Sequence, residues 1–392
     1  MLKKYKNIYT EDLKEKVIPF WIKNSPDFEF GGYFTCLDKD GSVYDDKKYM
    51  WLQAREVWMF ARLYNEFEQK QEYLDLAKLG VDFIRKYGKD EKGRIYFSLT
   101  RQGKPYFYQR KPYSAVFYVL ALIEYSKATG QREYFEEASE LFWNIIKWID
   151  EPALLGRDVL AGSVAMSNLA NVMVLASMAI ELALVDKKDE YIEIMKKALD
   201  SAKLHYNKKH KILIENIPLV DMDVSLWPEA RLFNPGHSIE AAWFILHLLD
   251  FVEDAEAEDI AYKALKGSLE YGWDNKYGGL YYFMDIENRP TLQLESSMKL
   301  WWAHTEAIYA LILAYSKTGE KIWLDWLEKV HQYTYSHFVD NEVGGWFGYC
   351  DQQGNLTHTC KGGNYKGFFH VPRALFSSCK KLEKIISTNK VE

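Results

Sequence analysis

Two histidines lie where a loop gives way to a helix, a setting in which an imidazole can act as a base. His237 follows an Asn-Pro-Gly turn at residues 234–236, and an apolar helix pattern begins directly after it. Free backbone N–H groups and the positive end of a helix dipole lower the pKa of a nearby imidazole. A neutral imidazole is a usable base near pH 7. His237 is therefore a candidate for proton transfer, with Glu240 about one helical turn further on.

His370 occupies a similar setting near the end of the chain. Arg373 follows it by three residues, and Pro372 sets the first turn of the helix, so both side chains start on the same side. A lone histidine at a helix end is more often a structural residue than a catalytic one. Because two of them occur in matching settings, the sequence favours a functional interpretation for the pair.

Further candidates lie inside otherwise apolar helix patterns. Arg55 needs either an acidic partner or a polar ligand, because burial of an unpaired charge is costly; a structural salt bridge remains the alternative. Trp302, His304 and Glu306 share one segment, but His304 and Glu306 are two positions apart and cannot share a helix face. At most one of these two side chains is expected to point to the centre. The sequence contains no Gly-rich phosphate loop, zinc triad or nucleophile elbow.

A repeated unit of two helices and a short hairpin must position these residues. The hairpin signature, an acidic residue followed by glycine and aromatic residues, recurs around Gly31, Gly93, Gly278 and Gly344, with fainter versions near 155–157 and 210–215. Six units of this kind predict an all-α fold, an (α/α)6 barrel with short β-hairpins between the units; an open solenoid is the alternative. The predicted helices are 10–24, 49–69, 71–87, 113–129, 132–149, 163–184, 188–206, 238–252, 255–272, 300–318, 321–338 and 369–388.

Composition limits the partners and the location of the protein. No linker divides the 392 residues, so one domain over 1–392 is predicted. The net charge of −6 gives no electrostatic reason to expect nucleic acid as a partner. Four cysteines without metal-ligand spacing, and no apolar run of membrane-spanning length, favour a soluble cytoplasmic protein without a membrane partner. A homodimer is compatible with the sequence but is not indicated by it.

The chain resembles the N-acyl-D-glucosamine 2-epimerase family, also known as renin-binding proteins. The resemblance covers nearly the whole chain and keeps its order. It is carried by the blocks 31–38 (GGYFTCLD), 51–58 (WLQAREVW), 234–240 (NPGHSIE), 273–283 (WDNKYGGLYYF), 299–302 (KLWW), 346–349 (WFGY) and 361–373 (KGGNYKGFFHVPR).

The resemblance implies an (α/α)6 barrel and roles for individual residues. His237 and His370 match the acid/base pair of the family, and Glu240 matches a carboxylate beside the first histidine. The substrate-binding residues implied or proposed here are Arg55, Glu240, Trp302, His304, Glu306 and Arg373. The implied reaction removes the proton at C2 of an open-chain sugar and returns one on the other face, which explains a need for two bases. No metal or other cofactor is expected.

Alternative functions remain open at this stage. The leading hypothesis is interconversion of N-acyl-D-glucosamine and N-acyl-D-mannosamine. The second is a 2-epimerase or aldose–ketose isomerase on unmodified hexoses such as mannose, glucose and fructose, or on a disaccharide such as cellobiose. A glycosidase or a sugar-binding protein is a third, although a glycosidase would use two facing carboxylates. Nucleotides stimulate some family members, but the segment at 156–158 lacks the Gly-Lys loop suggested for that contact, which argues against a nucleotide effector.

Overall fold

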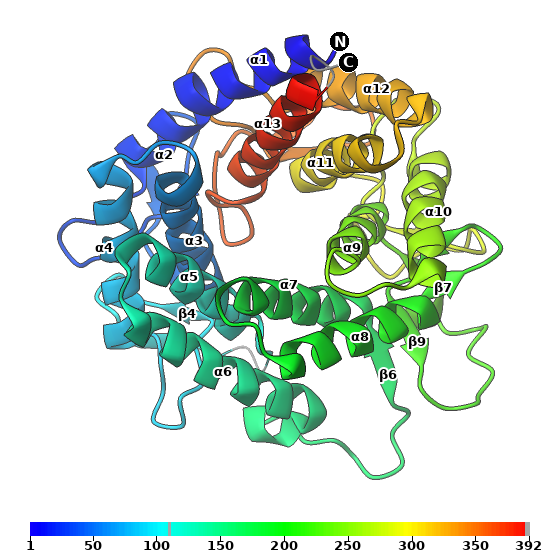
Figure 1. The fold of residues 1–392 in the computed structure, drawn as a ribbon, viewed down its shortest axis with the longest axis horizontal. Helices are drawn as coiled ribbons and strands as arrows, with labels where there is room; N and C mark the ends of the chain where they lie inside the picture. The colour runs from blue at the N-terminus through cyan, green and yellow to red at the C-terminus, as the bar shows by residue number, and fades with distance from the viewer. Residues whose placement is uncertain (109–110, 389–392) are drawn as a thin grey trace.

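The helices of the protein form two concentric rings, as a computed structural model describing residues 1–108 and 111–388 shows (Figure 1). The inner ring consists of α3 (Met50–Glu66), α5 (Tyr113–Thr129), α7 (Leu169–Val185), α9 (Pro235–Leu248), α11 (Trp301–Thr318) and α13 (His370–Thr388). The outer ring consists of α1 (Leu2–Asp12) with α2 (Ile18–Asn24), and of α4 (Gln71–Tyr87), α6 (Arg132–Asp150), α8 (Asp189–Leu204), α10 (Ala255–Gly272) and α12 (Lys321–His337). The predicted (α/α)6 barrel is confirmed.

The ring closes where the first and last helices meet. A π-helical turn, Leu13–Val17, joins α1 to α2, so the first helix of the barrel begins at Leu2 and not at residue 10 as predicted. Tyr5, Tyr9 and Leu13 recur at helical spacing and are buried, and α1 packs against α13. The extension is stable because this apolar stripe is covered on both sides, and the Tyr9 hydroxyl reaches His331 Nδ1 of α12 at 3.1 Å.

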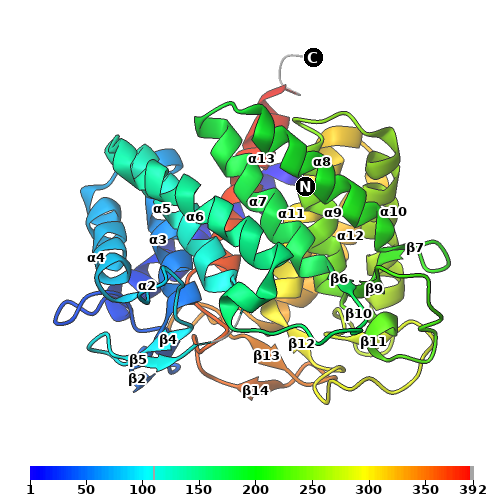
Figure 2. The same cartoon turned by 90° about the horizontal axis from the view of Figure 1, so that it is seen from below.

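The short strands gather at one end of the barrel (Figure 2). They form six small antiparallel sheets, with the pairings β1-β2, β3-β4-β5, β6-β9, β7-β8, β10-β11 and β12-β13-β14. Their bounds are β1 (Cys36–Leu37), β2 (Val43–Asp45), β3 (Lys48–Tyr49), β4 (Ser98–Leu99), β5 (Pro105–Phe107), β6 (Met166–Asn168), β7 (Tyr206–Asn207), β8 (Ile212–Leu213), β9 (Asn216–Pro218), β10 (Leu232–Phe233), β11 (Met284–Asp285), β12 (Lys299–Leu300), β13 (Tyr349–Cys350) and β14 (Leu356–His358).

Three of the repeated Gly-Gly turns are held by the same buried ion pair. Each turn begins with an aspartate, and the ammonium group of a lysine 21 to 25 residues later in the chain lies against its carboxylate. The pairs are Lys48 with Asp27 (2.9 Å), Lys299 with Asp274 (3.0 Å) and Lys361 with Asp340 (2.5 Å). All three lysine side chains are fully buried. Each pair therefore connects a turn to the segment that precedes an inner helix, which is β3 for Lys48, β12 for Lys299 and the loop before α13 for Lys361.

The unit around α7 differs from the prediction. The helix begins at Leu169, six residues later than predicted, because Met166–Asn168 pairs with β9 and the Asn168 side chain caps the helix by accepting from the Ala170 N–H at 3.0 Å. The hairpin predicted near 155–157 is a 3₁₀ turn, Pro152–Leu155, without a strand. A second 3₁₀ turn, Glu229–Arg231, precedes β10. None of the described helices is both long enough and apolar enough to cross a membrane.

Candidate active site

A pocket opens at the end of the barrel that carries the hairpins, where α9, α11 and α13 begin. Its volume is about 550 Å³. It is lined by Trp51, Arg55, His237, Glu240, Tyr282, Glu295, Met298, Leu300, Trp301, Trp302, Tyr349, His358, Tyr365 and His370. Both candidate histidines therefore face the same cavity, although they come from helices far apart in the sequence.

The first turn of α9 is built to present His237. Asn234 is the N-cap residue, and its side chain accepts from the His237 backbone N–H at 3.0 Å; Pro235 occupies the first helical position. The helix thus begins three residues earlier than predicted. Gly236 lies against the indole of Trp302, where a Cβ atom would come within 2.6 Å of the ring. Glycine at this position allows α9 and α11 to approach closely beside the histidine.

The carboxylate of Glu215 contacts the His237 ring at Nδ1. Its Oε1 lies 2.8 Å from His237 Nδ1, and among the described residues Nε2 makes no hydrogen bond. Burial lowers the pKa of His237, but the charge and hydrogen bond of Glu215, with a contribution from Glu240, outweigh burial and raise it above 6.5. The prediction that the helix terminus would lower this pKa was wrong, since a carboxylate in hydrogen-bond contact acts more strongly than a helix end.

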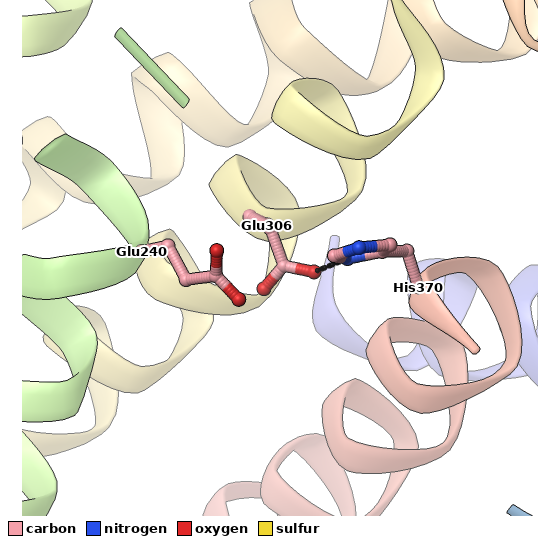
Figure 3. A group of neighbouring side chains, drawn as sticks. All are labelled: Glu240, Glu306 and His370. Atoms are coloured by element: carbon pink, nitrogen blue, oxygen red, sulfur yellow. Dashed lines mark hydrogen bonds and ion pairs between the residues drawn. The ribbon is translucent and has the colours of Figure 1, made fainter. Parts of the chain in front are cut away.

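His370 is held in the same way by a different carboxylate. Its Nδ1 lies 2.7 Å from Glu306 Oε1, and the two side chains point toward one another from α13 and α11, with the carboxylate of Glu240 on α9 beside them (Figure 3). Burial, together with the positive charges of Arg55 and Arg373, lowers the pKa of His370 well below 6.5, although Glu240 raises it. A neutral imidazole near pH 7 is thus confirmed for this histidine.

Trp302 lies against both histidines. Its ring centroid is 5.0 Å from that of His237 and 5.9 Å from that of His370. The indole is buried, so it forms a wall of the pocket against which both imidazoles rest. Both imidazoles therefore pack against one aromatic side chain and line the same cavity.

A network of charges forms the floor of the site. Nη2 of Arg373 lies 2.8 Å from Glu240 Oε1 and 2.7 Å from Glu306 Oε1, and Trp243 Nε1 donates to Glu306 Oε2 at 3.1 Å. The carboxylates of Glu306 and Glu240 raise the pKa of Arg373 further, although burial lowers it. Arg373 is a permanent cation that fixes both carboxylates, and through Glu306 it fixes the His370 ring.

Arg55 is a buried cation, and none of the carboxylates that the structure describes lies against it. Its guanidinium carbon lies 4.4 Å, 3.9 Å and 4.7 Å from the ring centroids of Trp51, Phe117 and Phe369. Its Nε has no hydrogen-bond partner among the described residues. Burial, with repulsion from Arg373, lowers the pKa of Arg55 to about 9, so it stays charged at pH 7. The structural salt bridge considered for Arg55 is not formed in the described part of the chain, and its charge is directed at the pocket.

His304 lies outside the pocket, contrary to its predicted role in substrate binding. Its ring is fully buried on the other side of α11, where Nε2 accepts from the Leu280 N–H at 2.9 Å and Nδ1 lies 2.7 Å from the Leu300 carbonyl. Burial lowers its pKa to about 3, so the ring is neutral and structural. The expectation that only one of His304 and Glu306 points to the centre is confirmed, and that residue is Glu306.

Glu215 is the residue that sequence reasoning missed. It follows β8 in the run Ile212–Ile217, where it is the only charged residue among apolar ones and one asparagine, and it is 6% exposed. A single carboxylate in an apolar run beside a short strand was the available signal. Its partner could not be identified, because His237 is separated from it by a loop whose path the sequence does not reveal.

Glu240, Glu306 and His370 offer three ligand atoms that lie within 4.8 Å of one another. Glu306 Oε1 already accepts from both His370 and Arg373, and Glu240 Oε1 accepts from Arg373. A metal ion at this point would face two guanidinium groups, those of Arg373 and Arg55. The donor set therefore suits a network closed by arginine better than a metal centre.

The other mouth of the barrel holds a separate cavity of about 380 Å³. Glu306, Arg373 and His247 line this second cavity, whereas His237 and His370 do not. The cavity at the hairpin end is the one in which two histidines and a free arginine converge.

The fold and the site together define an (α/α)6 barrel with a two-histidine pocket, and comparison with known proteins specifies it further. The family model for N-acylglucosamine 2-epimerase matches residues 32–374. N-acylglucosamine 2-epimerase of Mus musculus is 40% identical over 371 residues, which cover 92% of this chain and 88% of that protein. The Homo sapiens protein of the same name is 38% identical, covering 92% and 86%. The chain belongs to the N-acylglucosamine 2-epimerase family.

A solved structure supports the fold independently. Cellobiose 2-epimerase from Bacillus thermoamylovorans B4167 superposes with a TM-score of 0.82 over 97% of this chain and 100% of that chain, at 21% sequence identity. At this level of identity the likeness concerns the fold alone.

Proposed function

We propose that this protein is a carbohydrate 2-epimerase that interconverts N-acyl-D-glucosamine and N-acyl-D-mannosamine without a cofactor. The observation that carries the proposal is the arrangement of the two histidines. Each engages a carboxylate through Nδ1, at 2.8 Å and 2.7 Å, each rests on the same indole, and the two residues, from α9 and α13, line one cavity.

The chemistry needs two proton-transfer groups on opposite faces. The C2 proton of the open-chain sugar is acidic because it is alpha to the C1 carbonyl. One neutral histidine removes it, the electron pair of the C–H bond forms a C1=C2 double bond, the carbonyl π pair passes to O1, and an enolate forms. The other histidine, in its protonated form, returns a proton to C2 from the opposite face and restores the carbonyl with inverted configuration.

Arg55 is the group suited to stabilise the intermediate. It is a cation held by aromatic rings, and no carboxylate of the described residues lies against it, so its hydrogen-bond donors are available to an oxyanion. A preformed, buried cation at the pocket wall needs no rearrangement when the charge develops. Arg373, in contrast, is occupied by Glu240 and Glu306, and it acts by positioning His370.

The N-acyl substituent is proposed from the relatives. The mouse and human proteins, at 40% and 38% identity, carry the name N-acylglucosamine 2-epimerase, whereas the cellobiose 2-epimerase that superposes well is only 21% identical. A 2-epimerase or isomerase acting on unmodified hexoses is the alternative. The isomerase would share the first proton abstraction but return the proton to C1.

Incubation in heavy water followed by NMR tests the proposal. N-acetylglucosamine, N-acetylmannosamine, mannose and glucose are each incubated with the enzyme. The expected result is the C2 epimer of the N-acetyl sugars, with deuterium at C2, because the returning proton comes from a base that has exchanged with solvent. A ketose with deuterium at C1 would refute the 2-epimerase reaction, and conversion of the free hexoses alone would refute the N-acyl substrate.

The histidine pair is tested by substitution. His237→Ala and His370→Ala are each expected to lower turnover by about 10²-fold or more with the fold intact. His210→Ala serves as the matched control. The His210 ring lies between β7 and β8, outside the pocket, and stacks on Tyr271 of α10 with centroids 4.4 Å apart. Near-normal turnover in either of the first two variants would contradict the two-base scheme.

The finer expectations on location and assembly are part of the proposal as well. The cysteines are free, three of them buried, which supports a reducing, cytoplasmic location. The proposed partner is the sugar substrate, and a homodimer stays a prediction that the molar mass in solution tests.

A further inference from the structure

We propose that Glu215 is a positioning residue that makes the two histidines unequal: it orients the His237 ring and retains its proton, so that the resting enzyme carries a protonated His237 opposite a neutral His370. This inference rests on the proposed epimerase function for its catalytic meaning. The contact itself can be measured without substrate.

The position of Glu215 is fixed by its backbone. Its N–H donates to the Leu232 carbonyl at 3.0 Å, and its carbonyl accepts from the Leu169 N–H at 2.9 Å, so it is tied to β10 and to the start of α7. Its side chain is 8% exposed. A carboxylate held on both sides in this way cannot easily leave His237, and its bond to Nδ1 leaves Nε2 as the nitrogen that meets the substrate.

The two carboxylates that hold the histidines differ in how their charge is balanced. Glu306 is shared between His370 and Arg373, both at 2.7 Å, so a guanidinium already neutralises it. Glu215 forms an ion pair with His237 and with no arginine or lysine in the described part of the chain. A buried carboxylate without another cation favours the charged form of the imidazole that it contacts.

The remaining groups around His237 support the same assignment. Glu240 on the same helix adds a second negative charge, whereas His370 acts on it only when protonated. The phenols of Tyr113 on α5 and Tyr282 lie near Glu215, and the pKa of each is raised to about 12, by burial first and then by negative charge that includes Glu215, so both are neutral. The charge of Arg157 lowers the pKa of Tyr113 but does not outweigh these effects, and Arg157 forms no ion pair with Glu215 in the described part of the chain. His205 is also close to Glu215, and burial lowers its pKa, so it is neutral as well.

The consequence is a defined order of proton transfer. In the direction in which His370 removes the C2 proton, Nε2–H of His237 delivers its proton to the other face. His237 is then neutral and His370 protonated, and the resting state returns by exchange with solvent or by the reverse reaction. Because the overall equilibrium constant does not depend on pH, the pH profile of kcat/KM must have the same shape for both epimers.

Two substitutions separate charge from orientation. Glu215→Gln keeps an oxygen that can accept from Nδ1–H but removes the charge, whereas Glu215→Leu removes both. Glu229→Gln is the matched control, because it removes one negative charge from an exposed residue of the 3₁₀ turn Glu229–Arg231. Circular dichroism verifies that each variant is folded.

The first measurement is an NMR titration of protein labelled with ¹⁵N in its histidine rings, without substrate. The His237 signals are assigned from their loss in His237→Gln. In the wild type the pKa of the His237 ring is expected to lie above 6.5, because Glu215 outweighs the effect of burial. Glu215→Gln is expected to lower the pH of its titration midpoint by about 1 or more, since an opposite charge within 4–6 Å changes a pKa by about 1–3. An unchanged midpoint would overturn the proposal, whether or not the protein proves to be an epimerase.

The second measurement is the pH profile of kcat/KM in both directions. In Glu215→Gln the alkaline limb of kcat/KM should shift to lower pH together with the NMR midpoint, while the acid limb stays at the same pH. If the midpoint falls by about 1 on the pH scale, kcat/KM at a pH above both midpoints should fall by about tenfold. Glu215→Leu should lose further activity at every pH because the ring is no longer oriented. A uniform loss in Glu215→Gln, with the alkaline limb unmoved, would show a merely structural residue and refute the assignment.

Discussion

Gly236→Ala is expected to disable the site without touching a catalytic atom. The added Cβ would lie 2.6 Å and 2.7 Å from two ring carbons of Trp302 and 2.8 Å from Ala303 Cβ. Ordinary carbon–carbon contacts are about 3.5–4.0 Å, so α9 and α11 must separate by about 1 Å or Trp302 must turn. The Cβ atom of Ala303 is attached directly to the backbone of α11 and cannot rotate away. The clash can therefore be relieved only if α9 and α11 move apart.

The magnitude follows from overpacking and from misplacement. Overpacking of this kind costs about 1–3 kcal/mol of unfolding free energy. A displacement of about 1 Å at a reacting group can cost about 10²-fold in rate, and both histidines rest on Trp302. We therefore expect kcat/KM to fall by about 10²-fold in a protein that is still folded.

Urea unfolding and epimerase kinetics check this prediction. Gly363→Ala is the matched control, because its Cβ would meet only the Tyr44 hydroxyl, at 3.2 Å. The double variant Gly236→Ala with Ala303→Gly should regain part of the activity, since one of the clashes is removed. Full activity in Gly236→Ala would refute the argument that this glycine sets the α9–α11 approach.

Further predictions concern the charges. Arg55→Met should lower kcat/KM by about 10²–10³-fold, and urea unfolding should show unchanged or higher stability, because the buried Arg55 charge has no carboxylate against it; a marked loss of stability would instead indicate a structural role. Lys299→Met should cost about 3–5 kcal/mol in urea unfolding, since it leaves Asp274 buried without its cation, and Lys299→Met with Asp274→Leu should recover most of that loss. Because the pKa of His370 is lowered, by burial first, its neutral form persists below pH 6.5, and the acid limb of kcat/KM should lie below that value, with activity lost as the pH falls through the lowered pKa; an acid limb at or above 6.5 would contradict this. Incubation with a chelator should leave activity intact, and loss that a divalent ion restores would show that Glu240, Glu306 and His370 bind a metal.

Local patterns explain why much of the fold could be predicted from the sequence. The inner helices α5, α7, α9 and α11 are largely apolar, whereas α13 and the outer helices are amphipathic. Most predicted bounds lie within a few residues of the observed ones. The recurrence of the turns around Gly31, Gly93, Gly278 and Gly344 was sufficient to predict a ring of paired helices. Errors occurred where distant segments intervene: α7 begins late because Met166–Asn168 pairs with β9, and α1 begins early because α13 and α12 cover it.

The sequence by itself determined which residue types stand at the starts of α9 and α13, and therefore that two histidines were available for proton transfer. Only the tertiary structure decided their environments. It places Glu215 against His237, which raises the pKa of His237. It buries His370 near two arginines, which lowers the pKa of His370. It also turns His304 away from the pocket. A pKa depends on charges a few ångströms away in space. A helix has 3.6 residues per turn, so its side chains point in all directions around its axis. Which side faces the substrate is settled by the neighbouring helices, so it is a property of the closed ring.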